Sequence, residues 1–150
     1  MSVDIERWDP PNDPAAFESL CLDLWQEICE GHAQKNGRSG QPQAGVDIFG
    51  QQQGKWIGVQ CKQKDGLLRH RVTHNELAKE VAAALEFTPP LSKFVLATTG
   101  PRDAGIQELA RVLTTQHRGR GLFEVEVWCW DDIWIELYRR EPLFKLIASN

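Results

Sequence analysis

The sequence predicts a mixed α/β domain in which helices pack on both faces of a central sheet. Segments whose apolar residues recur at helical spacing alternate along the chain with short runs of β-forming residues. The run at residues 93–99, KFVLATT, is largely apolar and has the length of a strand, which is typical of a strand covered on both faces. This alternation favours a mixed sheet flanked by helices, in the order α-β-β-α-β-α-β-α.

The first helix is predicted to begin at Pro14 and to end near residue 30. Asp13 can serve as its N-cap, and proline is well suited to the first helical position. The apolar positions of this helix repeat at helical spacing and are Phe17, Leu20, Cys21, Leu24, Trp25 and Ile28. A polar, glycine-rich stretch without periodicity follows at residues 31–45, where we expect a loop.

Two short strands are expected after this loop, at residues 46–48 and 56–62. Because side chains alternate between the faces of a strand, each strand divides into two sets. In the second strand, one face carries Ile57, Val59 and Cys61 and the other carries Trp56, Gln60 and Lys62. In the first strand, Val46 and Ile48 are expected to point one way and Asp47 the other. The pattern predicts a common polar face that holds an acid, an amide and an ammonium group.

The rest of the chain completes the alternation of helices and strands. A basic loop at residues 64–72 leads to a second helix that opens with the capping box Thr73-His74-Asn75-Glu76 and is stopped by Pro89 and Pro90. The remaining expected elements are a strand at residues 93–99, a helix at about residues 102–116, a strand at residues 123–130, and a closing helix capped by Asp131 or Asp132.

Length and composition are those of one globular domain. The 150 residues can bury a sizeable core, and the contents of 41% hydrophobic and 25% charged residues are ordinary. The four cysteines form no CxxC pair and lie in apolar patterns, so we expect reduced thiols in the core. No apolar run approaches the length of a membrane span and the N-terminus is polar, so we expect a cytoplasmic protein without membrane contact.

The formal net charge of −4 does not by itself indicate a protein that binds nucleic acid. Basic residues nevertheless gather just after the second strand, at Lys62, Lys64, Arg69 and Arg71. A local basic rim of this kind can bind phosphate on a protein that is acidic overall.

The polar face of the two strands has the composition of a magnesium site. Mg²⁺ prefers oxygen ligands and retains several waters. Asp47 can supply a carboxylate oxygen, Gln60 an amide oxygen, and Cys61 its backbone carbonyl. Lys62 would stand beside the metal, where it could orient or help deprotonate an attacking water, or stabilise charge on a phosphate. These groups together predict the hydrolysis of phosphodiester bonds.

These residues resemble a known family. The pattern D-x(n)-Q-x-K on paired strands, preceded by a helix bearing a glutamate, resembles the PD-(D/E)xK nuclease superfamily. The stretch GVDIFG…WIGVQCKQK is most similar to the Mrr-like restriction endonucleases, in which Q-x-K commonly stands where other branches have E-x-K. The resemblance covers about residues 17–130 and implies a restriction-endonuclease-like fold. Its specificity comes from the matching order of helices and strands, because the motif itself is short.

The resemblance implies a role for each matching residue. Asp47 becomes the metal-binding acid, Gln60 the second ligand and Lys62 the catalytic lysine, while Glu18 on the first helix matches a glutamate that supports the metal. Val46 stands where the family often has proline. The neutral Gln60 leaves the site with one fewer negative charge than an E-x-K site.

The resemblance also implies a substrate and a setting. We expect a Mg²⁺-dependent endonuclease, which Mn²⁺ could also activate, acting on double-stranded DNA in antiphage defence, with Lys64, Arg69 and Arg71 contacting phosphates. Cutting both strands needs two sites, so a homo-oligomer is expected. Residues 1–150 would form one Mrr-like domain, either the N-terminal module of a longer protein or the partner of a separate sensor. Two alternatives stay open: a catalytically silent DNA-binding or oligomerisation module of the same fold, and an RNA nuclease.

Overall fold

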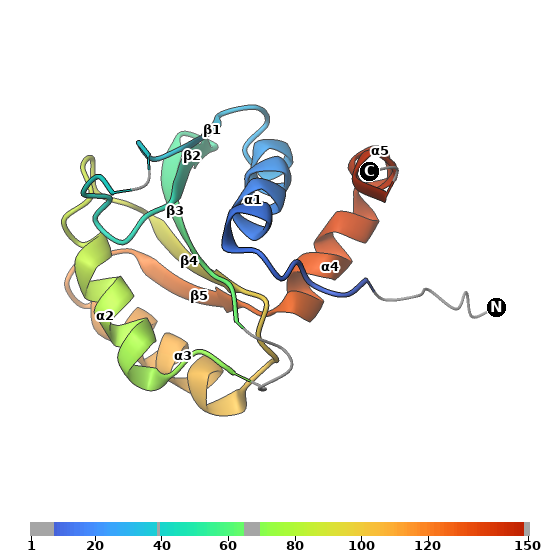
Figure 1. The fold of residues 1–150 in the computed structure, drawn as a ribbon. Helices are drawn as coiled ribbons and strands as arrows, with labels where there is room; N and C mark the ends of the chain where they lie inside the picture. Colours follow the sequence, from blue (N-terminus) through green and yellow to red (C-terminus); the bar gives the residue numbers. More distant parts are fainter. Residues whose placement is uncertain (1–7, 39, 65–69, 149–150) are drawn as a thin grey trace.

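The computed structural model describes residues 8–38, 40–64 and 70–148. Its centre is a five-stranded mixed sheet with helices on both faces (Figure 1), as the sequence predicts. The strands lie in the order β1 (Ala33–Lys35), β2 (Ile48–Gln52), β3 (Lys55–Lys62), β4 (Lys93–Thr98) and β5 (Glu124–Trp128). The pairs β1–β2 and β2–β3 are antiparallel, whereas β3, β4 and β5 run parallel to one another. The parallel strands therefore end together at one edge of the sheet, next to Lys62.

Five helices cover the two faces of the sheet in the described part of the chain. They are α1 (Pro14–Ile28), α2 (His74–Ala84), α3 (Ala104–Arg118), α4 (Trp130–Arg139) and α5 (Glu141–Ala148). Figure 1 shows α1 and α4 on one face and α2 and α3 on the other, with α5 beside α4. Two separate clusters of buried apolar side chains fill the two layers, which is why the sheet needs strands that are apolar on both sides.

Strand β4 is covered on both faces, as its continuous apolar run predicts. Val95 and Ala97 belong to the cluster beneath α1 and α4, whereas Phe94 and Leu96 belong to the cluster beneath α2 and α3. Each of the four is at most 1% exposed. Full burial of side chains such as Phe94 or Leu96 stabilises the fold by about 1.5–3 kcal/mol each.

The helix starts are confirmed at the caps that the sequence indicates. Asp13 accepts a hydrogen bond from the Ala15 N–H, and Pro14 is the first residue of α1. The Thr73 hydroxyl accepts from the Glu76 N–H while the Glu76 carboxylate accepts from the Thr73 N–H, so the capping box of α2 is complete.

Two elements were not expected. Strand β1 lies within the stretch that was predicted to be a loop. The sequence does not reveal this strand, because Ala33 is its one buried residue and three residues are too few to show alternation. Helix α5 follows α4 after the single residue Arg140 and is held by side chains distant in sequence, including the stack of Phe144 on Trp8, whose ring centroids lie 4.2 Å apart. Both elements exist because of pairing and packing that a local pattern does not reveal.

The last strand and the closing helix meet earlier than expected. β5 ends at Trp128, and Trp130 already belongs to α4, whose N-cap is Cys129. The expectation that Asp131 or Asp132 is the N-cap is therefore wrong: both lie in the first turn of α4, where the Asp132 carboxylate accepts from the Cys129 N–H at 3.0 Å. Among the described residues, no helix is both long and apolar enough to cross a membrane.

Candidate functional site

Asp47 lies in a bend immediately before β2, at the point where the chain enters the sheet. Its N–H donates to the Val59 carbonyl at 2.8 Å, and its own carbonyl accepts from the Asn36 N–H at 2.7 Å. Val46 is buried beneath α2 and α3, whereas Ile48 is buried beneath α1 and α4. The expectation that Val46 and Ile48 share a face is therefore wrong, because the chain turns at Asp47 instead of running straight through it.

The loop before Asp47 is fixed against α2. Gly45 has φ of +65°, and a Cβ added there would lie 2.9 Å from the Ala83 Cβ and 3.0 Å from the Glu80 carbonyl oxygen. Only glycine fits this left-handed conformation and this close approach. The Asn36 amide adds two bonds, to the carbonyls of Val46 at 2.9 Å and Gln43 at 3.0 Å. The backbone that carries Asp47 is thus held from both sides.

The end of β3 meets the Asp47 carboxylate. The Cys61 N–H donates to Asp47 Oδ2 at 2.8 Å. Because the N–H and C=O of one strand residue point toward the same neighbouring strand, the Cys61 carbonyl is directed to the Asp47 side as well. The division of β3 into two faces is confirmed, since Ile57, Val59 and Cys61 all pack in the cluster beneath α1 and α4.

The Gln60 amide also lies against Asp47. Two acceptors surround it, so we orient the amide with its nitrogen donating to Asp47 Oδ2 at 3.2 Å and to the Gly45 carbonyl at 3.0 Å. In this orientation the amide oxygen, the expected metal ligand, faces away from Asp47. Rotation of the amide about its terminal bond would bring the oxygen to the same place.

Lys62 forms an ion pair that the sequence analysis missed. Its Nζ lies 2.9 Å from Oε1 of Glu80 on α2, and Glu80 is only 9% exposed. The sequence contains a signal for this pair. Glu80 falls on the same buried helical face as Leu77, Val81 and Ala84, and a carboxylate is rarely buried on such a face without a partner.

Glu18 approaches the same site from α1, on the other face. The pKa of Asp47 is raised, and burial is the largest cause. The Glu18 and Glu80 carboxylates also raise this pKa, whereas the hydrogen bond from the Cys61 N–H and the Lys62 ammonium lower it. The structure therefore brings Glu18, Glu80 and Lys62 within electrostatic range of Asp47. Three carboxylates against one ammonium leave a net charge of −2, which one divalent cation would balance.

The Cys61 side chain lies on the α1 side of the sheet, near Cys21 and Glu18. A hydrogen bond with Cys21, followed by burial and the nearby Asp47 and Glu18 charges, holds the pKa of the Cys61 thiol well above its usual range. The raised pKa favours the protonated thiol in the metal-free protein, so the backbone carbonyl is the oxygen ligand that Cys61 offers to a hard cation. The four cysteines are free thiols, as expected.

The oxygen donors at this site are of the kind that Mg²⁺ accepts. Among the described residues, no three His, Cys, Asp and Glu side chains are placed so that they could hold one ion together. Mg²⁺ is usually bound by one or two carboxylates and otherwise by carbonyl oxygens and water. Asp47, Glu18, the Cys61 carbonyl and a rotated Gln60 amide make up such a set.

The expected phosphate contacts carry acidic partners where the structure describes them. Lys64 Nζ lies 2.6 Å from Glu76 Oε2, and an Arg71 guanidinium nitrogen lies 2.9 Å from Asp103 Oδ2. A phosphate would have to compete with these carboxylates. The third expected contact, Arg69, lies outside the described residues.

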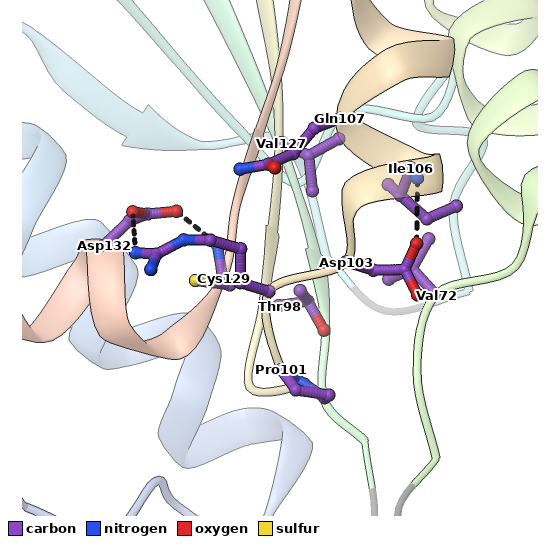
Figure 2. A pocket seen from close by; sticks show the side chains of 10 residues that line it. Val72, Thr98, Pro101, Asp103, Ile106, Gln107, Val127, Cys129 and Asp132 are labelled. Carbon is purple, nitrogen blue, oxygen red and sulfur yellow. Dashed lines mark hydrogen bonds and ion pairs between the residues drawn. The ribbon is translucent and has the colours of Figure 1, made fainter.

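A separate pocket lies where the ends of β4 and β5 meet the starts of α3 and α4 (Figure 2). Its polar groups are bonded to one another: Asp132 accepts from Arg102 at 2.9 Å, and Asp103 accepts from the Ile106 N–H at 3.0 Å. Thr98 at the pocket wall also donates to the Lys62 carbonyl at 2.7 Å. Thr98 thus links the wall of this pocket to the end of β3.

Comparisons of the chain with family models, with curated proteins and with solved structures found no match. The resemblance of the Asp47, Gln60 and Lys62 pattern to the Mrr-like nucleases therefore supports a proposal and does not establish membership of that family.

Proposed function

We propose that this protein is a metal-dependent endonuclease of the PD-(D/E)xK type that hydrolyses phosphodiester bonds of double-stranded DNA. The observation that carries the proposal is the convergence of Asp47, Gln60, the Cys61 carbonyl and Lys62 at one end of β3, where the Glu18 and Glu80 carboxylates bring the net charge of the cluster to −2. An acid, an amide, a carbonyl and a fixed cation side by side suit the handling of a metal and a phosphate.

The residues divide into two groups in this proposal. Asp47, Glu18, Gln60 and the Cys61 carbonyl would hold Mg²⁺, or Mn²⁺ in its place. When bound, the ion would act as a Lewis acid on the phosphate and lower the pKa of a bound water. Lys62 would place its positive charge beside the attacking water and the scissile phosphate, where negative charge builds up as the P–O bond breaks.

The substrate and the biological setting rest on the resemblance. Mrr-like domains suggest double-stranded DNA and an effector role in antiphage defence. Two copies of the chain would be needed to cut both strands, and a sensor domain or partner protein would control them. Lys64, Arg69 and Arg71 remain the proposed phosphate contacts, of which Lys64 and Arg71 would exchange their acidic partners for phosphate.

The proposal is tested by incubating the protein with plasmid DNA and Mg²⁺ or Mn²⁺ over a range of protein concentrations, with EDTA as the blank. We expect metal-dependent nicking or linearisation that falls by roughly 10²-fold or more in Lys62→Ala, because a charge aimed at the transition state is lost. Lys55→Ala is the matched control, since Lys55 is an exposed lysine at the opposite end of the same strand.

Each other outcome has a definite meaning. Equal cutting by a folded Lys62→Ala variant would place the activity elsewhere and contradict the proposed site. Binding of DNA without turnover at any concentration would indicate a silent module of the same fold. Parallel assays with single-stranded DNA and RNA identify the preferred substrate, and cleavage of RNA alone would replace DNA as the target.

A further inference from the structure

Glu80 is a buried carboxylate whose position next to Lys62 calls for an explanation. The Glu80 side chain is 12% exposed and the Lys62 side chain 28%, with 2.9 Å between Oε1 and Nζ. Taking two charges out of water is costly, and replacement of a buried pair by apolar residues is often neutral or stabilising. The pair is therefore weak evidence for stability and a reason to look for a role in function.

We propose that Glu80 is a positioning residue that holds the Lys62 ammonium beside Asp47 and prevents it from pairing with Asp47 directly. This inference rests on the proposed function and deepens it, because it assigns one of the two roles open to Lys62. A lysine that deprotonates water needs a free electron pair on its nitrogen. An ammonium held in an ion pair acts instead as a fixed positive charge.

The geometry shows why Glu80 can do this. The Lys62 backbone is anchored to β4, since its carbonyl accepts from the Thr98 hydroxyl at 2.7 Å. Only the side chain remains to be oriented, and α2 presents Glu80 to it. A Cβ added at Gly45 would lie 3.3 Å from Glu80 Oε2, so the same carboxylate lies close to the loop that carries Asp47. The Lys62 and Glu80 charges both act on Asp47, one lowering its pKa and the other raising it.

Without the Glu80 charge, the Lys62 ammonium would be free to turn to the Asp47 carboxylate, whose pKa it already lowers, since Glu76 is held by Lys64. An ammonium bound to Asp47 would compete with a divalent cation for the same oxygen atoms. Glu80→Gln keeps the size and one oxygen of the side chain but removes its charge. We therefore expect this variant to bind Mg²⁺ more weakly and to need more Mg²⁺ for half-maximal cleavage.

The chain offers a matched control. Glu76 lies one helical turn before Glu80 and pairs with Lys64 at 2.6 Å. Glu76→Gln makes the same chemical change in a second lysine–glutamate pair of α2 and preserves the capping box, which accepts glutamine at this position. Glu80→Asp keeps the charge on a shorter side chain and should retain more activity than Glu80→Gln if charge is what matters.

The experiment measures Mg²⁺ affinity by calorimetry and plasmid cleavage at varied Mg²⁺ and DNA. It compares wild type, Glu80→Gln, Lys62→Met and the double variant, after circular dichroism confirms their folds. We expect Glu80→Gln to lose roughly 10- to 100-fold in metal affinity or cleavage rate, with the KM for DNA nearly unchanged. In the Lys62→Met background the same change should have little further effect, because the residue it acts through is gone. Glu76→Gln should match wild type in Mg²⁺ affinity, which is the readout used for this control because Glu76 holds Lys64, a proposed phosphate contact.

The outcomes separate this inference from the proposed function. An equal loss of Mg²⁺ affinity from Glu80→Gln with and without Lys62 would overturn it, because Glu80 would then act on the metal independently. Unchanged affinity and cleavage in Glu80→Gln would overturn it as well. If Lys62 and Glu80 prove coupled in Mg²⁺ binding while wild type cuts no nucleic acid, the positioning role stands and the nuclease proposal fails. A wild type that binds no Mg²⁺ or Mn²⁺ contradicts both.

Discussion

At the scale of single residues, Asp47 is the residue on which the proposed metal site depends. Burial and the Glu18 and Glu80 charges raise the pKa of Asp47 despite the hydrogen bond from the Cys61 N–H. A carboxylate held under such repulsion is unfavourable for the protein alone and favourable for binding a cation. Sites of this kind commonly exchange stability for function.

Asp47→Asn should therefore stabilise the metal-free protein near neutral pH. Because the folded-state pKa is raised, the contribution of Asp47 to stability is greatest below the unfolded-state value and is lost as pH rises through the folded-state value. We expect Tm at pH 7 to rise by roughly 2–4 °C, the shift that about 1 kcal/mol gives in a domain of this size. Thermal unfolding with and without Mg²⁺ measures this.

Magnesium should raise the Tm of wild type but not that of Asp47→Asn, since only a ligand that binds the folded state stabilises it. Asp23→Asn, which removes an exposed carboxylate from α1, is the control for the change in charge alone. A lower Tm for Asp47→Asn at pH 7, or a Mg²⁺-induced rise equal to that of wild type, would contradict the assignment of Asp47 as the strained ligand.

At the scale of elements, β5 is the edge strand on the parallel side of the sheet, and α3 protects it. The Thr114 hydroxyl accepts from the Val125 N–H at 2.9 Å and donates to the Val125 carbonyl at 3.1 Å. One side chain thus satisfies both backbone groups that this residue turns outward. Exposed strand edges pair readily with other chains, so such protection opposes unspecific association.

Thr114→Val should destabilise the protein and make it more prone to associate. The isosteric change removes both hydrogen bonds and leaves two backbone groups unsatisfied, which we expect to cost about 1–3 kcal/mol. Urea unfolding measures the stability, and light scattering at increasing concentration measures association. Thr115→Val is the control, because the exposed Thr115 hydroxyl bonds only the Arg111 carbonyl of its own helix. Equal behaviour of the two variants would show that Thr114 does not guard the edge.

At the scale of the whole molecule, carboxylates with shifted pKa values connect helices to one another and to loops. Burial acts to raise the pKa of Asp132, but hydrogen bonds from Arg102 and Cys129 outweigh it and lower the pKa below its usual value of 3.8. The pKa of Glu76 is lowered in the same way. Burial acts to raise it, but the hydrogen bonds from Lys64 and from the Thr73 N–H outweigh burial. These groups act in the opposite direction to Asp47.

A lowered pKa contributes stability that is present above the unfolded-state value and is lost as pH falls through the folded-state value. Asp132→Asn should accordingly reduce stability by about 0.5–1 kcal/mol at pH 7, as the loss of a partly exposed ion pair does. The difference from wild type should shrink below pH 3.8. Urea unfolding across this range, with Asp23→Asn as control, tests the sign. A difference that grows as pH falls would contradict it.

Local patterns were sufficient for much of this protein. Three features depend on residues close together in the chain: the caps at Asp13 and Thr73, the two apolar faces of β4, and the alternation of Gln60 with Cys61. The sequence by itself therefore determined the mixed α/β class and the pattern Asp47, Gln60 and Lys62. The start of α4 was placed too late, because β5 ended sooner than its apolar pattern suggested and Cys129, not an aspartate, became the N-cap.

Only the tertiary structure decided which groups surround that pattern. Three contacts join segments that are distant in sequence: the bonds of the chain at its turn at Asp47, the approach of Gly45 to α2, and the ion pair of Lys62 with Glu80. Short elements such as β1, and α5 with its stack on Trp8, likewise depend on non-local packing. Hydrogen bonding and periodicity within one element are local, whereas the electrostatic environment of a carboxylate is the sum over every element packed around it.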